Sequence, residues 1–129
     1  MTPYSEIIPA APYRVLEAIW YESIHNTLKE ELFVYPYRHE DEFEIDHQYK
    51  FRKTLIKLTG TELHFVVHDH SNHQADVFIQ VTPVRKNESK VEYTIENSSL
   101  NGTQGKVLGW ILETIQTVSE HYIHLRKTA

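Results

Sequence analysis

The sequence predicts an α+β fold, in which an antiparallel curved sheet of about six strands wraps on a long C-terminal helix, with two short helices after the first strand. The segment from Asn101 to Ala129 is the only long, uninterrupted amphipathic stretch of the chain. The region from His47 to Asn97 instead consists of short alternating segments separated by turn residues. Each pattern leaves an apolar face that needs cover, so we expect the helix to lie on the sheet.

The C-terminal helix carries a regular apolar stripe, which we expect to be buried. Its members recur three or four residues apart, the spacing of one face of an α-helix: Val107, Ile111, Ile115, Val118, Tyr122 and Leu125. Leu108, Trp110 and Leu112 widen this face. Gly109 disagrees with the pattern, because glycine inside a helix costs about 1 kcal/mol relative to alanine. It marks either the close approach of a strand or room left for a bound molecule.

The N-terminal part of the chain predicts a strand, a helical pair and a further strand. The elements are Tyr4 to Ile8, a helix from Ala10 to about Leu28, and Leu32 to Tyr37. Pro9 ends the first strand, and Pro12 is tolerated because it lies in the first turn of the helix. A break near Ser23 to Asn26 divides the helix in two, and Pro36 restricts the second strand to an edge or a bulge.

The middle of the chain predicts a meander of antiparallel strands joined by tight turns. The strands are Gln48 to Leu58, Glu62 to His70, Gln74 to Pro83 and Ser89 to Asn97. Alternation assigns their apolar face to Leu63, Phe65, Val67, Ala75, Val77, Ile79, Val81, Val91, Tyr93 and Ile95. In the first strand, Tyr49 and Phe51 fit one register while Ile56 and Leu58 fit the other. We therefore expect a bulge near Thr54.

The composition limits the class of protein. With 129 residues the chain fits one domain, residues 1–129, that can bury a core without disulfides. The formal net charge of -5 argues against a nucleic-acid binder, which usually has a basic face. The sequence has no cysteine, no signal-peptide pattern and no apolar run long enough to span a membrane. We therefore expect a cytoplasmic protein.

Two charged runs follow each other before and inside the meander. The acidic residues are Glu40, Asp41, Glu42, Glu44 and Asp46, and the basic residues are Lys50, Arg52, Lys53 and Lys57. We expect these opposite charges to neutralise each other across neighbouring strands of a solvated surface. The acidic run could also hold a hard cation or supply a paired acid and base. It lacks the glycine and the regular oxygen spacing of an EF-hand loop, so a solvated loop is favoured.

The start of the chain, together with the order of elements, resembles a known superfamily. A strand, a small residue and a proline precede a helix with an apolar pair: Ile7-Ile8-Pro9-Ala10-Ala11-Pro12-Tyr13-Arg14-Val15-Leu16-Glu17-Ala18-Ile19-Trp20. This resembles the START and pollen-allergen-like superfamily, also called SRPBCC or polyketide cyclase-like. Within that group, the size and the Tyr-rich middle of this chain resemble a family of small Gram-positive bacterial proteins classed as a domain of unknown function. The resemblance implies a helix-grip fold and a cavity, and it supplies no catalytic residues.

A group of histidines is the most conspicuous candidate for chemistry. It comprises His64, His68, Asp69, His70 and His73, across one strand and the following turn. Imidazole nitrogens on one strand face can bind a transition metal. We favour an exposed polar strand face, because no further ligand at regular metal-motif spacing supports a site. We predict no metal and no cofactor.

The sequence offers no catalytic residues. It has no cysteine nucleophile, no G-x-S-x-G motif and no glycine loop that would hold a phosphate. His121 and His124 lie on the terminal helix and are expected at its surface or at the rim of a pocket. A catalytic role for His121 would require its burial beside a cavity.

Aromatic and apolar residues from several predicted elements converge between the sheet and the terminal helix. The pocket candidates are Tyr35, Tyr49, Phe51, Phe65, Val67, Val77, Tyr93, Gly109, Trp110, Ile111 and Tyr122. Apolar walls with a few phenolic hydroxyls form a normal small-molecule site, although the same rings could simply fill the core. The leading hypothesis is a non-catalytic protein that binds a hydrophobic or amphipathic small molecule between sheet and helix.

Two alternatives belong to other functional classes. The first is an interaction module, a homodimer or an adaptor with a filled core, which uses an exposed strand or the Leu32 to Tyr37 segment. It is motivated by Val66 and Phe78 on the otherwise polar sheet face. The second is an enzyme of the cyclase or dehydratase kind sometimes built on this fold. No convergent acid and base in the sequence supports it.

Overall fold

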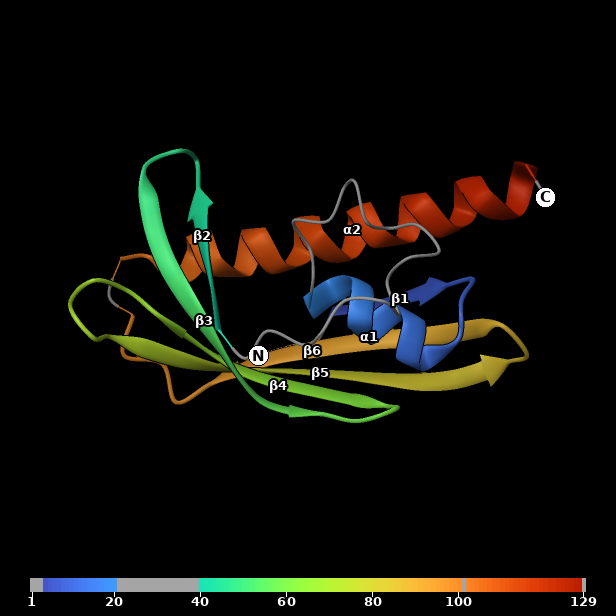
Figure 1. Cartoon of the computed structure of the whole chain (residues 1–129), viewed down its shortest axis with the longest axis horizontal. Helices are drawn as coiled ribbons and strands as arrows, with labels where there is room; N and C mark the ends of the chain where they lie inside the picture. Colours follow the sequence, from blue (N-terminus) through green and yellow to red (C-terminus); the bar gives the residue numbers. More distant parts are fainter. Residues whose placement is uncertain (1–3, 21–39, 101, 129) are drawn as a thin grey trace.

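The computed structural model describes residues 4–20, 40–100 and 102–128. Its elements are β1 (Tyr4–Ile8), α1 (Pro12–Trp20), β2 (Glu40–Ile45), β3 (Tyr49–Leu58), β4 (Glu62–His68), β5 (Gln74–Arg85), β6 (Glu88–Glu96) and α2 (Gln104–Thr128). The predicted fold class is confirmed, since a curled antiparallel sheet lies against a long C-terminal helix (Figure 1). The predicted second short helix and the predicted strand from Leu32 to Tyr37 lie outside the described residues.

All six strands belong to one antiparallel sheet with the order β1-β6-β5-β4-β3-β2. Strands β3 to β6 form the predicted meander, and β1 pairs with β6. Asn72 and Asn87 adopt positive φ in the tight turns, a conformation that asparagine tolerates better than most residues. The expected bulge lies between Leu55 and Lys57, close to the predicted Thr54. This order leaves β2 at one edge of the sheet.

Helix α2 covers the concave face of the sheet through most of its predicted stripe. Val107, Ile111, Ile115 and Val118 are buried, and Tyr122 is half-buried against the core. The prediction for Leu125 is wrong, because 46% of this residue is exposed. Figure 1 shows the C-terminal end of α2 standing away from β5 and β6, in keeping with this exposure.

Helix α1 fills the space between α2 and the sheet (Figure 1). It buries Val15, Leu16, Ala18, Ile19 and Trp20, and its hydrophobic residues recur at helical spacing. The Trp20 ring meets the Phe65 ring of β4 edge-on, with 5.5 Å between centroids. This geometry is favourable for aromatic pairs and anchors the end of α1 on the middle of the sheet.

The acidic run is a strand, not the solvated loop expected from the sequence. Glu42 and Glu44 alternate with Phe43 and Ile45, so this end of β2 has one charged side and one apolar side. Ile45 is buried, and Phe43 packs against the core. The apolar residues of this short segment therefore hold it on the sheet despite its charge.

Lys53 is the largest departure from the expected solvated surface. It lies on the inward side of β3 and only 1% of it is exposed. Its Nζ donates a hydrogen bond to the backbone carbonyl of Trp20, the last residue of α1, and lies 4.4 Å from the centroid of the Trp20 ring. No basic residue occurs in the last turn of α1. Lys53 therefore supplies, from the sheet, the positive charge that a helix C-terminus favours.

Candidate functional site

A groove of about 680 Å³ lies between the edge strand β2 and the first half of α2. Consecutive residues from Glu42 to His47 line its strand side. The helix side is lined by Gly105, Lys106, Gly109, Trp110, Glu113 and Thr117. In Figure 1, β2 rises beside the N-terminal turns of α2, so the groove lies where the helix meets the edge of the sheet.

Stacked aromatic rings form the apolar wall of the groove. The ring planes of Phe43 and Trp110 lie 14° from parallel, with centroids 4.0 Å apart. Phe43 also stacks on Phe51, and Trp110 meets Phe65 edge-on at 6.2 Å. The stack therefore runs from the groove into the core, and the half-buried Trp110 presents part of its indole to the groove.

Two glycines leave part of the helix side of the groove without side chains. Gly105 and Gly109 lie one helical turn apart and both line the groove. A Cβ added at either position would meet no atom within 4 Å in the described part of the chain. The sequence offered two explanations for Gly109. The close approach of a strand is wrong, because the residue faces open space.

An ion pair closes one end of the groove. Lys106 on α2 donates a hydrogen bond to Asp46 in the β2–β3 turn, with 2.7 Å between Nζ and Oδ2. The hydrogen bond and charge of Asp46 raise the pKa of Lys106. Asp46 and His47 both adopt positive φ, near 57° and 56°. The turn is thus strained in its backbone and held to the helix by a side chain.

Polar groups line the groove beyond the aromatic wall. Thr114 donates a hydrogen bond from Oγ1 to the backbone carbonyl of Trp110, at 2.8 Å. Glu113 and Thr117 are exposed on the same helix. The groove therefore combines a flat apolar surface with carboxylate, ammonium and hydroxyl groups.

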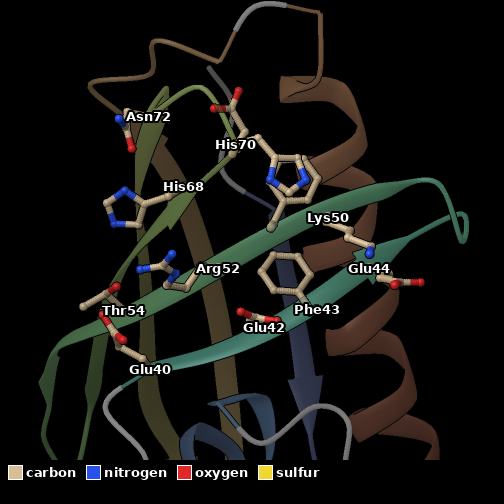
Figure 2. A pocket seen from close by; sticks show the side chains of 12 residues that line it. Glu40, Glu42, Phe43, Glu44, Lys50, Arg52, Thr54, His68, His70 and Asn72 are labelled. Atoms are coloured by element: carbon tan, nitrogen blue, oxygen red, sulfur yellow. The ribbon is translucent and has the colours of Figure 1, made fainter.

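A second pocket, of about 690 Å³, lies on the outer side of β2 and β3 (Figure 2). Carboxylates from β2 and basic groups from β3 line it, and the β4–β5 turn completes it with His68, Asp69, His70 and Asn72. We call it the outer pocket. The groove and the outer pocket share Glu42, Phe43 and Glu44, so strand β2 separates them.

The structure divides the predicted pocket residues into three groups. Phe51, Phe65, Val67, Val77 and Ile111 are buried in the core, and Phe51 also lines the outer pocket. Tyr49, Tyr93, Trp110 and Tyr122 pack partly buried against that core. Burial raises the pKa of the Tyr93 and Tyr122 phenols. Gly109 and Trp110 line the groove, and Tyr35 lies outside the described residues.

The predicted histidine group is spread over three environments. His68 and His70 line the outer pocket, while the His73 ring lies 3.2 Å from Asp69 in the turn. Partial burial of Asp69 is outweighed by hydrogen bonds from the His73 and Ser71 backbone, which lower the pKa of this carboxyl. Among the described residues, no three histidines or carboxylates converge as metal ligands.

A histidine–aspartate pair on the outer sheet face was not predicted. His64 Nε2 lies 2.9 Å from Asp76 Oδ1, and the Asn97 amide donates to Asp76 Oδ2. The hydrogen bond with His64 is the main reason why the pKa of Asp76 is lowered. Alternation placed His64 and Asp76 on the same polar face, but the pairing of their strands was needed to bring them together.

The same pair explains why the apolar residues expected on this face are not exposed as a patch. The His64 ring stacks on Phe78, with 4.1 Å between centroids, and Phe78 is half-buried. Val66 is only 9% exposed, between cross-strand neighbours Thr54 and Asp76. The expectation that Val66 and Phe78 form an exposed apolar surface is therefore wrong.

The comparisons with known proteins identify the fold and no family. No protein-family model matches the chain, and no curated protein is similar to it in sequence. Similar solved structures include the protein XoxI from Bacillus cereus (14% identity, 97% of this chain and 96% of that chain, TM-score 0.61) and protein CV1439 from Chromobacterium violaceum (13%, 92% and 96%, TM-score 0.54). At such identities the similarity concerns the fold alone.

Neither described helix has the length and apolar character of a membrane span.

Proposed function

We propose that this protein binds an amphipathic small molecule in the groove between β2 and α2, without catalysing a reaction. The observation that carries the proposal is the pair Gly105 and Gly109. Both open the groove beside the stacked Phe43 and Trp110 rings, in a helix whose opposite face is tightly packed. Larger side chains would fill this space and would favour the helix, so the glycines are costly unless the space is used.

The size and lining of the groove support a ligand with a flat apolar part and polar substituents. Its volume of about 680 Å³ lies within the range of roughly 300–1,000 Å³ that is usual for small-molecule sites. The Trp110 and Phe43 rings offer the apolar surface, and Glu113 and Thr117 offer polar partners along the helix. The ligand would lie at the mouth of the space between sheet and helix, because aromatic side chains occupy the interior.

The resemblance to the START and pollen-allergen-like superfamily supports the same proposal. That resemblance implies a ligand held between a curled sheet and a terminal helix, and the groove lies between those two elements. We therefore also propose membership of this superfamily. This part of the proposal is an argument from analogy of fold, whereas the argument from the glycines stands on this chain alone.

A thermal-shift screen over lipids, polyketide-like aromatics and glycosides tests the proposal. A ligand that binds only the folded state stabilises it by mass action and so raises the melting temperature. At a free ligand concentration of one hundred times the Kd, the free energy of unfolding rises by about 2.7 kcal/mol. The Gly109→Leu variant fills the groove and should abolish the shift. Gly60→Leu is a matched control, because Gly60 also has open space around it and lies in the β3–β4 turn, outside the groove. Equal shifts in both variants would contradict the site.

An interaction module is the second candidate, favoured by the exposed end of α2. Leu125 continues the buried stripe past the sheet and is 46% exposed, with Ile123 on the same two turns and Tyr13 exposed on α1. Self-association through this end would cover these side chains. Light scattering at micromolar concentration tests it: a Leu125→Glu variant should dissociate a dimer, and a wild type that is monomeric excludes the dimer.

A further inference from the structure

We infer that the ligand of the groove is a cation, a flat aromatic ring that carries an ammonium group on a short chain. This inference rests on the proposed function, because it names the chemical class of the molecule that the groove between β2 and α2 would take. It is carried by the charge of the lining, by the position of Glu113 beside the open space at Gly105 and Gly109, and by the aromatic wall.

The described residues that line the groove carry an excess of negative charge. Four of them are carboxylates and one is a lysine: Glu42, Glu44, Asp46, Glu113 and Lys106. With His47 neutral, four negative charges and one positive charge leave this lining with a formal charge of -3. The two glutamates of β2 have basic cross-strand neighbours on β3, Arg52 and Lys50, but these line the outer pocket and not the groove. The potential in the groove therefore favours a cation.

Glu113 is the carboxylate best placed for a ligand on the helix side of the groove. It follows Gly109 by one helical turn, as Gly109 follows Gly105, so the three residues lie along one face of α2. The side chain of Glu113 is exposed, and Thr117 continues the same face by one more turn. A molecule that lies on the two glycines therefore has a carboxylate, and then a hydroxyl group, at its end.

An anionic ligand would find no comparable partner in the groove. Lys106 is the only lysine or arginine among the described lining residues, and its Nζ already lies 2.7 Å from Asp46 Oδ2. Lys53 lies 5.8 Å from the centroid of the Trp110 ring, but it is 1% exposed and donates to the backbone carbonyl of Trp20. An anion would thus have to break an existing ion pair, whereas a cation leaves that pair intact.

The aromatic wall favours a cation that carries a flat ring. Phe43 and Trp110 stack with 4.0 Å between their centroids, and the half-buried indole of Trp110 borders the groove. A ring of the ligand can pack against the accessible part of this indole. Tryptophan is also the side chain that attracts cations most strongly. The ring and the ammonium group are therefore recognised by adjoining parts of one groove, the stacked rings and Glu113.

Three indoles that differ in the group at the end of a two-carbon chain test this inference. Tryptamine carries an ammonium group, tryptophol a neutral hydroxyl and indole-3-propionate a carboxylate. Each is titrated into the ¹⁵N-labelled protein at neutral pH, and the Trp110 indole N–H and the amides of Gly105 and Gly109 are followed. We expect tryptamine to bind at least about fivefold more tightly than tryptophol, and indole-3-propionate to bind most weakly. Added salt should weaken the binding of tryptamine more than that of tryptophol.

Two glutamates of α2 provide a matched pair of variants. Glu113→Gln should weaken the binding of tryptamine by about fivefold or more and leave that of tryptophol unchanged, because only tryptamine is charged. Glu120→Gln should leave both unchanged, since Glu120 is equally an exposed glutamate of α2 but lies two turns further on, outside the groove.

The outcomes separate this inference from the proposed function. If tryptophol or indole-3-propionate binds in the groove as tightly as tryptamine, the groove holds a small molecule and the inference about its charge is overturned. Equal effects of Glu113→Gln and Glu120→Gln on tryptamine overturn it as well. If no indole moves the groove resonances while a compound of the thermal-shift screen does, the inference fails and the proposed function stands. If no compound of either set moves them, both fail.

Discussion

The space between the sheet and α2 is closed at one end and open at the other. At the closed end, α1 buries Val15, Leu16 and Trp20 against β4, β5 and β6. At the open end, no helix of the described chain lies between β2 and α2, and the two elements meet through Phe43 and Trp110 beside the groove. The same layers thus make a packed core where a third element is inserted and a groove where it is not.

The contrast shows which residue types signal stability and which signal a site. The closed end uses large apolar side chains that contribute about 1.5–3 kcal/mol each on burial. The open end uses glycines on α2 and a tight turn with positive φ at Asp46 and His47. The glycines do not favour the helix, so their role is sought in binding.

The largest effect is expected from the buried stripe of α2. Ile115→Ala should lower the free energy of unfolding by about 2–5 kcal/mol, because Ile115 is completely buried between sheet and helix. Leu125→Ala should change it by less than about 0.5 kcal/mol, since Leu125 is exposed. Urea denaturation measures both. Similar losses in the two variants would show that the end of α2 is packed as tightly as its centre.

The second effect concerns Lys53 and Lys50 of β3. Lys53→Met should destabilise the protein by about 1–3 kcal/mol, because the buried carbonyl of Trp20 loses its Nζ donor. Lys50→Met, three residues earlier on the exposed side of the strand, should change stability by less than about 0.5 kcal/mol. A Lys53→Met variant as stable as the wild type would mean that the charge does not hold α1 on the sheet.

A smaller and opposite effect is expected at the open end. Gly109→Ala should raise the free energy of unfolding by about 0.8–1.0 kcal/mol, because alanine is the better helix former and its Cβ meets open space. Thermal denaturation measures the gain. A loss of stability would indicate that an element packs closely on this face, which would remove the argument for a groove.

The smallest effect is a dependence of stability on acid pH. The pKa of Asp76 is lower in the folded protein than its ordinary value of 3.8, so the carboxylate stabilises the fold above that pH. This contribution should be lost as pH falls from about 4 through the lowered folded pKa. Asp76→Asn should therefore reduce the slope of stability against pH in this range. An unchanged slope would show that the contacts with His64 and Asn97 do not favour the ionised form.

Much of the fold could be predicted because it follows from periodicity. Alternation fixed the inward residues of β4 to β6, and helical spacing identified α2 down to Val118. The error at Leu125 arises because an apolar stripe on a helix does not show where the surface that covers it ends. The β2 strand was missed because its four acidic residues outweighed Phe43 and Ile45 in a short segment.

The candidate sites depended on contacts that no local pattern contains. Gly109 was a usable signal, since a glycine inside an amphipathic helix is unfavourable, and it does line the groove. The outer pocket required the register between β2, β3 and β4, which brings residues distant in sequence side by side. Lys53 could not be assigned inward, because the bulge made the phase of β3 ambiguous and its partner is the backbone of a distant helix.

The two tryptophans offer the most direct test of ligand binding at the open end. Trp20 is 1% exposed in the closed end, whereas Trp110 lines the groove. In an NMR titration with the compound that gives the largest thermal shift, the indole N–H resonance of Trp110 and the amides of Gly105 and Gly109 should move together. The Trp20 indole should stay in place. Movement of the Trp20 indole without that of Trp110 would place the ligand in the interior and contradict binding in the groove.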